Sequence, residues 1–281
     1  MKNHPWYLLA PLLALSSELV AGGGWTQPRH NGYFKLESRL LRARNYYNAG
    51  GGITDITTTS LYTTSLYGEY GLTDRLTAIV YFPFVTRLVV NKQSFRPSGF
   101  TVPGDAATSV GDTDVSLKFG IIRNKPLVLS ASLTLGIPFG RVNAGDTKIL
   151  TTGDGEFNQL VKVEAGLSFP GGYAAAVVGF NNRTRSFSDE FHYGLEVGTS
   201  VKRFSGLVRL YAVQSLFNGS AGERVNSVFS NNVEYISYGP ELAYTVRDKF
   251  GVTAAAAFAA AGKNILAAPT YSVGVFLKLK K

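Results

Sequence analysis

The sequence predicts an all-β protein: a closed antiparallel up-and-down transmembrane β-barrel of about 12 strands. Apolar and polar side chains alternate with a period of two along most of the chain, and long and short connections alternate between the expected strands. After the N-terminal stretch, no run of about 18 or more apolar residues offers a transmembrane helix. Composition agrees, since 31 Gly, 15 Tyr and 18 Phe occur while only 17% of residues are charged.

The first residues have the character of an export signal. Lys2 supplies positive charge, and the apolar stretch Trp6–Leu15 is too short to span a bilayer as a helix. Small residues follow at a suitable cleavage position, and two prolines argue against an N-terminal helix of the fold. We therefore expect a signal peptide at residues 1–23 and a single barrel domain at residues 24–281.

Alternation marks about twelve expected strands, with boundaries set to within a few residues. They are Gly32–Leu41, Thr57–Leu72, Leu76–Arg87, Gly111–Ile122, Leu127–Ile137, Glu156–Phe169, Tyr173–Arg183, Glu190–Lys202, Phe204–Leu216, Asn231–Val246, Gly251–Ala261 and Thr270–Lys280.

The connections between these strands alternate in length. Short turns such as Thr73–Arg75 and Pro170–Gly172 alternate with long stretches at Arg42–Ile56, Leu88–Val110, Pro138–Gly155 and Phe217–Ser230. Outer-membrane barrels have this pattern, with short periplasmic turns, long outer loops and both termini on the periplasmic side. The sequence therefore predicts export to the outer membrane of a Gram-negative cell, in contact with lipid and lipopolysaccharide.

The alternation also assigns a face to each side chain. Even-numbered residues from Leu66 to Phe84 are apolar and are expected to face lipid. In the strand Asn231–Val246 the pattern changes parity: Val233 and Tyr235 are expected to face outward, with a bulge at Gly239–Pro240 resetting the phase.

The last strand resembles the terminal signal read by the barrel assembly machinery. Polar, glycine and apolar residues occur there at the spacing of that signal, although the usual terminal aromatic is replaced by lysines. The residues concerned are Ser272, Gly274, Leu277 and Leu279.

Several segments resemble one outer-membrane family, called "putative meta-pathway of phenol degradation", a set of predicted transporters. The segments are Tyr70–Phe84 ("YGLTDRLTAIVYFPF"), Gly111–Ile121 ("GDTDVSLKFGI"), Leu133–Gly140 ("LTLGIPFG") and Thr152–Gln159 ("TGDGEFNQ"). The resemblance implies a channel or transporter that passes small solutes, hydrophobic or aromatic ones among them, across the outer membrane.

Charged and polar residues of both signs are expected to face the lumen, where they either form a solute path or a salt-bridge network that closes it. They are Lys35, Glu37, Arg39, Glu69, Asp112, Asp114, Lys118, Lys162, Glu164, His192, Glu196, Arg209 and Lys278. Two alternatives to a channel stay open at this point: a structural or adhesion barrel with a sealed lumen, and a secreted β-sandwich binding module.

The sequence gives little support to other classes of function. Cysteine is absent, which excludes a disulfide scaffold, a Cys-based zinc site and a lipoprotein anchor. The net charge is +9, but Lys and Arg are scattered, so we expect no nucleic-acid partner. Gly153–Glu156 lacks the spaced ligands of a calcium loop, and His192 lacks an evident catalytic partner. We therefore expect no catalytic residues, no metal and no cofactor.

Overall fold

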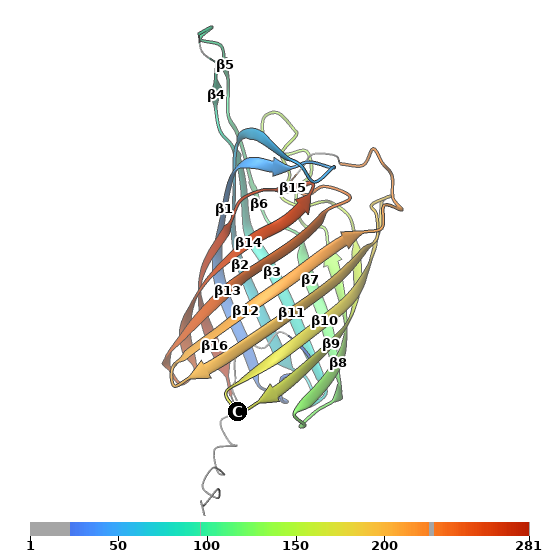
Figure 1. The fold of residues 1–281 in the computed structure, drawn as a ribbon, viewed down its shortest axis with the longest axis vertical. Helices are drawn as coiled ribbons and strands as arrows, with labels where there is room; N and C mark the ends of the chain where they lie inside the picture. Colours follow the sequence, from blue (N-terminus) through green and yellow to red (C-terminus); the bar gives the residue numbers. More distant parts are fainter. Residues whose placement is uncertain (1–22, 96, 225–227, 281) are drawn as a thin grey trace, which may run out of the picture.

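The computed structural model describes residues 23–95, 97–224 and 228–280, so the predicted signal peptide falls almost wholly outside the described residues. Fourteen strands form one closed antiparallel sheet (Figure 1). Two of them are short, β6 (Asp105–Ser109) and β15 (Ile265–Leu266), and the other twelve make the barrel wall. The predicted closed up-and-down barrel is confirmed. No helix in the described part of the chain is long and apolar enough to cross a membrane.

The wall strands follow one another around the barrel in chain order, and β1 closes the circle by pairing with both β2 and β16. The strands are β1 (Gly32–Tyr47), β2 (Ile53–Gly71), β3 (Leu76–Val90), β7 (Thr113–Ile122), β8 (Leu127–Ile137), β9 (Asn158–Phe169), β10 (Gly172–Arg183), β11 (Glu190–Val201), β12 (Phe204–Ser215), β13 (Glu234–Arg247), β14 (Phe250–Lys263) and β16 (Thr270–Leu279).

Short turns gather at one end of the barrel, together with the C-terminus, and longer connections gather at the other (Figure 1). By the rule for outer-membrane barrels, the short-turn end is periplasmic and the long-loop end extracellular. Within the connection from β3 to β7, a small hairpin of β4 (Gln93–Ser94) and β5 (Thr101–Val102) projects beyond the rest of the molecule (Figure 1).

The long connection predicted between the first two strands is in fact short. β1 continues to Tyr47 and β2 begins at Ile53, so five residues rather than Arg42–Ile56 join them. The charged residues Arg42 and Arg44 end the apolar alternation, which suggested the end of a strand. Outside the membrane both faces of a hairpin can be polar, so backbone pairing continues after the lipid-facing pattern has stopped.

Successive residues of β7, β8 and β11 face opposite sides of the wall, as the two-residue period predicts. On β7, Leu117 and Phe119 are 51% and 49% exposed, whereas Lys118 between them is 5% exposed. On β11, Leu195 is exposed beside a buried Glu196. Apolar side chains therefore cover the outside of the wall, and polar ones lie inside.

Two other strands, β3 and β13, differ from the expected pattern, one because it has a bulge and the other because it lacks one. On β3, Pro83 and Phe84 together stand opposite Ser65, so beyond this point Thr86 and Leu88 are buried inside the barrel. The predicted bulge at Gly239–Pro240 is wrong, because β13 pairs with β12 in unbroken register through both residues.

Without that bulge, the even-numbered residues of β13 stay outside along its whole length, and Tyr235 faces the lumen instead of lipid. The irregularity lies on the neighbouring strand, where Ala260 of β14 is the extra residue opposite Ile236 and Ser237. Both Tyr235 and Val233 had been expected to face outward; Val233 lies just before the strand.

Candidate functional site

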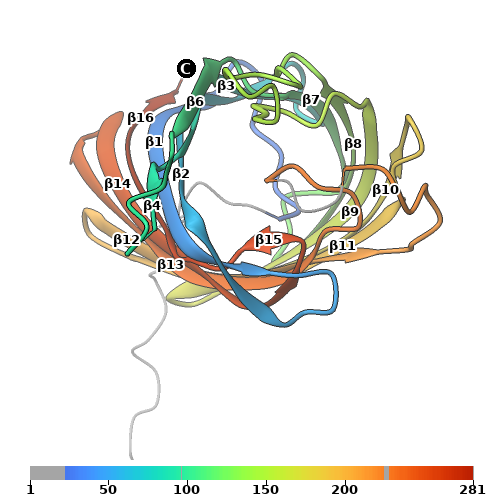
Figure 2. The same ribbon diagram turned by 90° about the horizontal axis from the view of Figure 1, so that it is seen from above.

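The candidate site is the lumen, whose contents divide into three levels. A chain segment lies inside the periplasmic end (Figure 2). Ion pairs line the middle. Folded loops cover part of the extracellular end (Figure 2). The levels are described in that order.

Residues 23–31 lie inside the barrel rather than outside it (Figure 2). Lys118 Nζ donates to the backbone oxygen of Gly23 at 2.9 Å. The Trp25 ring packs edge-on against Tyr173, with ring centroids 5.4 Å apart, and covers Gly166, where an added Cβ would lie 2.4 Å from the ring. A side chain at position 166 would therefore displace Trp25.

Further along, the same segment is bound to β2 and β3, where Thr77 stands opposite Lys118 in the β3–β7 ladder. The Gln27 backbone N–H donates to Thr77 Oγ1 at 2.9 Å, and the Gln27 side chain donates to Glu69 at 2.9 Å. The segment thus bridges the inner surfaces of β7, β9 and β10 to β2 and β3, and it narrows the periplasmic mouth. Sequence reasoning missed it; the available signal was Trp25, an isolated aromatic that belongs to no lipid-facing strand.

One group of ion pairs in the middle of the lumen is centred on Glu37 of β1. Its carboxylate contacts Lys35 at 2.7 Å and Arg39 at 2.6 Å, and Lys35 also lies 3.4 Å from Glu241 of β13. Glu241 was not predicted as a site residue, although its position beside the outward-facing Leu242 gives it inward parity.

Two further groups complete this level. Glu164 contacts Lys118 at 2.5 Å and Lys162 at 3.6 Å. Glu196 contacts Arg209 at 2.6 Å and accepts a hydrogen bond from the Tyr173 hydroxyl at 2.6 Å. Each group has a buried carboxylate at its centre.

The cations and anions of these groups differ in accessibility. The carboxylate side chains of Glu37 and Glu196 are 6% exposed, whereas the side chains of Arg39 and Arg209 are 45% and 46% exposed. Since these arginines point into the barrel, the solvent-accessible surface of the middle lumen carries guanidinium groups, and the neutralising carboxylates lie behind them.

The remaining predicted lumen residues have diverse surroundings. His192 lies between the Tyr211 hydroxyl at 2.8 Å and Glu190 at 3.1 Å. Lys278 lies over the Phe276 ring near the periplasmic end, at 5.6 Å from its centroid. Asp114 stands opposite Gly136 in the β7–β8 ladder, and Asp112 lies beyond the start of β7, at the extracellular rim.

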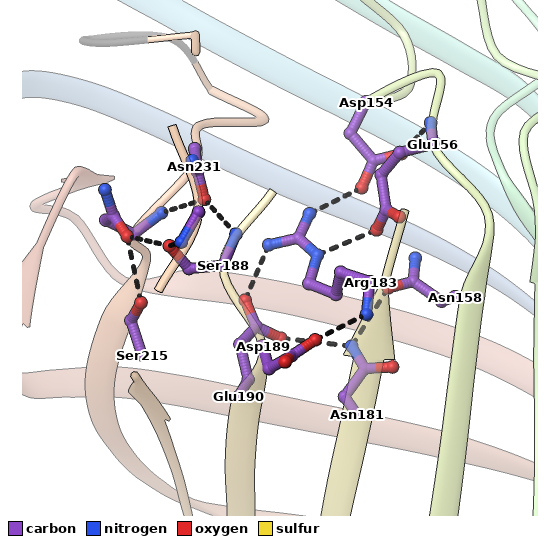
Figure 3. A network of polar contacts seen from close by, with 12 residues as sticks. Asp154, Glu156, Asn158, Asn181, Arg183, Ser188, Asp189, Glu190, Ser215 and Asn231 are labelled. Atoms are coloured by element: carbon purple, nitrogen blue, oxygen red, sulfur yellow. Dashed lines mark hydrogen bonds and ion pairs between the residues drawn. The ribbon is translucent and has the colours of Figure 1, made fainter. Parts of the chain in front are cut away.

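The extracellular level is held by Arg183, the last residue of β10 (Figure 3). Its guanidinium contacts Asp154 at 3.0 Å, Glu156 at 2.7 Å and Glu190 at 2.7 Å. The Arg183 side chain is 5% exposed and that of Glu156 is fully buried. The connection between β8 and β9 is thereby fixed to the rim of β10 and β11. Sequence reasoning considered Gly153–Glu156 only as a calcium loop and missed this network.

A second part of Figure 3 shows how the β12–β13 connection is held. The Ser188 backbone N–H donates to Asn231 Oδ1 at 2.9 Å, and Ser215 Oγ donates to Asn232 Oδ1 at 3.0 Å. This connection lies across part of the barrel opening in the view from above (Figure 2).

Asp112 attaches the β8–β9 connection at a separate point. It accepts hydrogen bonds from the backbone N–H of Gly140 at 2.8 Å and of Asp154 at 2.7 Å. Burial first, and the charge of Asp154 second, raise the pKa of Asp112 to about 7.

The residues expected to form the assembly signal lie on both faces of β16. Leu277 and Leu279 are exposed on the outside, at 48% and 40%, and Ser272 and Gly274 alternate with them on the inside. The structure thus places the apolar members where lipid or another membrane protein can contact them.

No group of His, Asp and Glu side chains in the described ranges is arranged to hold a metal ion. The fold and the two faces of its wall define a class: this is a transmembrane β-barrel of the outer-membrane type, with apolar side chains toward lipid and a polar lumen.

The chain belongs to the family described as "Putative MetA-pathway of phenol degradation", whose model matches residues 34–273. This confirms the family resemblance noted in the sequence. A comparison with curated proteins found no match.

Solved structures with a similar fold are also outer-membrane barrels. An outer-membrane channel from Pseudomonas putida F1 has a TM-score of 0.62 and 12% sequence identity, over 93% of this chain and 100% of that one. The translocator domain of the autotransporter NalP from Neisseria meningitidis has a TM-score of 0.55 and 10% identity, over 89% of each chain. At these identities the likeness concerns the fold.

Proposed function

We propose that this barrel is an outer-membrane channel that passes small solutes, hydrophobic or aromatic ones among them. The observation that carries this proposal is the solvent accessibility of Arg39 and Arg209. Their side chains are 45% and 46% exposed, although they point into the lumen of a closed barrel. A lumen filled by its own side chains would bury them. The fold similarity to a channel and the family description support the same function.

The sealed barrel is the second candidate, and specific contacts favour it. Residues 23–31 cross the periplasmic end, and the Arg183 network holds a loop at the extracellular end. In the channel proposal these two levels narrow the path and restrict passage to small solutes. In the sealed-barrel alternative they close it.

The supporting roles belong to the same proposal. Residues 1–23 act as a signal peptide; its removal takes away the contact of Gly23 with Lys118 and leaves those of Trp25 and Gln27. The motif at Ser272–Leu279 is read by the barrel assembly machinery, and lipopolysaccharide contacts the outer rim. The protein is not an enzyme in this proposal: His192 is bound to Tyr211 and Glu190, and neither partner is an activated nucleophile of the serine or cysteine type.

Planar-bilayer conductance combined with liposome uptake distinguishes the two candidates. We expect small single-channel steps, together with entry of small aromatic solutes and exclusion of oligosaccharides. A folded protein, shown by its gel shift on heating, that gives neither conductance nor uptake would establish the sealed barrel instead. Vesicles with heat-unfolded protein provide the control.

A further inference from the structure

An apolar groove of about 340 Å³ lies on the lipid-facing side of the wall, across β11, β12, β13 and β14. Phe204 and Leu242, which line it, are 65% and 63% exposed on the outer face. The outward residues of the row nearer the short turns are mostly large and stand in register across the four strands: Val201, Phe204, Tyr244 and Val252. The groove therefore begins at the periplasmic end of the wall.

Small residues in the next outward row form the depression. Gly206 pairs with Leu242, and Leu242 pairs with Ala254, so the wall has almost no side chain on either side of the leucine. This row lies about 7 Å farther from the turns along the strands. The groove thus runs from the turns toward the middle of the membrane, in the direction that an acyl chain takes from its headgroup.

Basic residues occupy the two short turns at the periplasmic end of these strands (Figure 1). Lys202 and Arg203 form the β11–β12 turn, and Arg247 and Lys249 lie at the β13–β14 turn. All four are exposed. Asp248 is the single acidic residue of the two turns, so together they carry a net positive charge.

Backbone contacts hold the two turns side by side. The Thr245 N–H donates to the backbone oxygen of Arg203 at 2.8 Å. Arg203 Nη1 donates to the backbone oxygen of Val246 at 3.4 Å, next to Arg247. Since the turns belong to neighbouring hairpins of the wall, their cationic side chains form one cluster.

This cluster borders the groove directly. Phe204 follows Arg203 in the chain, and its ring centroid lies 4.8 Å from that of Tyr244. Aromatic residues near the ends of barrel strands mark the membrane interface. The basic turns are therefore at the level of the lipid headgroups, and the groove is at the level of the acyl chains.

The charge of the cluster is not neutralised by the protein. Within the described ranges, none of the cationic side chains of Lys202, Arg203, Arg247 and Lys249 forms an ion pair. The lumen differs in this respect, because Lys35, for example, contacts Glu37 at 2.7 Å. An anionic partner would supply the missing charge.

We propose that the groove and the basic turns form one binding site for an anionic phospholipid of the periplasmic leaflet, with an acyl chain in the groove and the phosphate on the basic side chains. Guanidinium and ammonium groups both bind phosphate, and basic residues beside a membrane attract anionic lipids. A second copy of the chain fits less well, because it would bring its own basic turns to the same depth, where like charges repel. The site concerns the outer wall, so it holds whether or not the lumen conducts.

The test is native mass spectrometry of the folded protein, titrated with dioleoylphosphatidylglycerol or with dioleoylphosphatidylcholine, which has the same chains and no net charge. We expect phosphatidylglycerol to bind more tightly. Lys202→Gln combined with Arg247→Gln should weaken phosphatidylglycerol binding about tenfold or more, because each basic residue near an anionic lipid adds to the attraction. Phosphatidylcholine binding should change little. Equal binding of the two lipids by the unaltered protein would disprove the proposal.

Arg123→Gln combined with Lys125→Gln is the matched control. These residues lie at the β7–β8 turn, another short turn of the periplasmic end, and β9 and β10 separate it from β11. The control removes the same number of cations away from the groove, so phosphatidylglycerol binding should be retained. Equal losses in the two double variants would show a general effect of charge and overturn the site.

Gly206→Leu tests the apolar part. A Cβ at this position would first meet Leu242 Cδ2 at 3.4 Å, so the position has room for a side chain. We expect this variant to keep the gel shift on heating and to weaken both lipids alike. Unchanged binding of both lipids would exclude the groove from the site and overturn the proposal. So would a dimer mass that disappears in Gly206→Leu, because it would assign the groove to a second copy.

Discussion

The outer and inner faces of the same wall follow opposite rules. On β7, Leu117 is 51% exposed and its neighbour Lys118 is 5% exposed. In a water-soluble domain the leucine would be buried and the lysine solvated. Here lipid is the solvent of one face, and the other face satisfies its charges by pairing, as Lys118 does with Glu164 at 2.5 Å. The comparison shows that an exposed side chain in this molecule can contact either lipid or the lumen, and that its polarity follows from which of the two it contacts.

The largest expected effect comes from breaking an inner-face network. Arg183→Ala leaves three carboxylates without their shared partner, of which Glu156 is fully buried. Removing one member of a buried ionic group costs about 3–5 kcal/mol. We expect the β8–β9 connection to become sensitive to proteinase K in intact vesicles. Arg185→Ala, which changes an exposed neighbour, should leave resistance unchanged; equal cleavage of both variants would contradict this assignment.

Placing a charge on the outer face should reduce the stability of the folded barrel slightly less than Arg183→Ala does. Val80 is 41% exposed on the lipid side, and Val80→Arg should destabilise the folded barrel by about 2–4 kcal/mol. Ile79→Arg is the matched control: it lies at nearly the same depth, faces the lumen and stands opposite Glu69. Folded fractions in vesicles, measured by gel shift, should fall for Val80→Arg alone.

Thr77 is a less suitable inner control than its parity suggests. It is 1% exposed, because residues 23–31 cover it and the Gln27 N–H donates to its hydroxyl. Arginine there would displace the segment as well as test the face. Comparable losses from Val80→Arg and Ile79→Arg would show that the two faces of β3 had been assigned wrongly.

Loosening the segment at residues 23–31 should have a smaller effect. Trp25→Ala removes the edge-on contact with Tyr173, and such aromatic pairs contribute about 0.5–1.5 kcal/mol beyond their buried area. We expect the average conductance of the variant to rise without loss of the gel shift. Trp25→Phe retains a ring, so its average conductance should lie between that of the unaltered protein and that of Trp25→Ala. Unchanged conductance in both would show that the segment does not limit the path.

A dependence on pH is also expected at the extracellular rim. The pKa of Asp112 is raised in the folded protein, so its neutral form is favoured there, and docking of the β8–β9 connection is strongest below the ordinary pKa of about 3.8. This contribution is lost as the pH rises toward about 7. Proteinase sensitivity should therefore increase from pH 5 to pH 8, and Asp112→Asn should flatten that profile. An identical profile in Asp112→Asn would assign the titration to another group.

Strand order and most side-chain faces could be predicted because both are local properties. The two-residue period assigns Leu117 and Lys118 to opposite faces without reference to any other part of the chain, and short turns such as Thr73–Arg75 mark where the direction reverses. The prediction of a strand end was wrong at Arg42, where polarity changes although the strand continues. The two-residue pattern also shifts at Pro83, where a bulge changes the phase of the strand.

The sequence by itself therefore determined the class of protein, the order of its strands and the lipid-facing stripe of most of them. Only the tertiary structure decided which charges pair: Lys35 and Glu241 are 206 positions apart and meet because the wall closes. Closure also determined that Trp25 lies against Gly166. A periodic pattern records which solvent each residue faces, whereas contacts across the lumen depend on the circumference and stagger of the whole barrel.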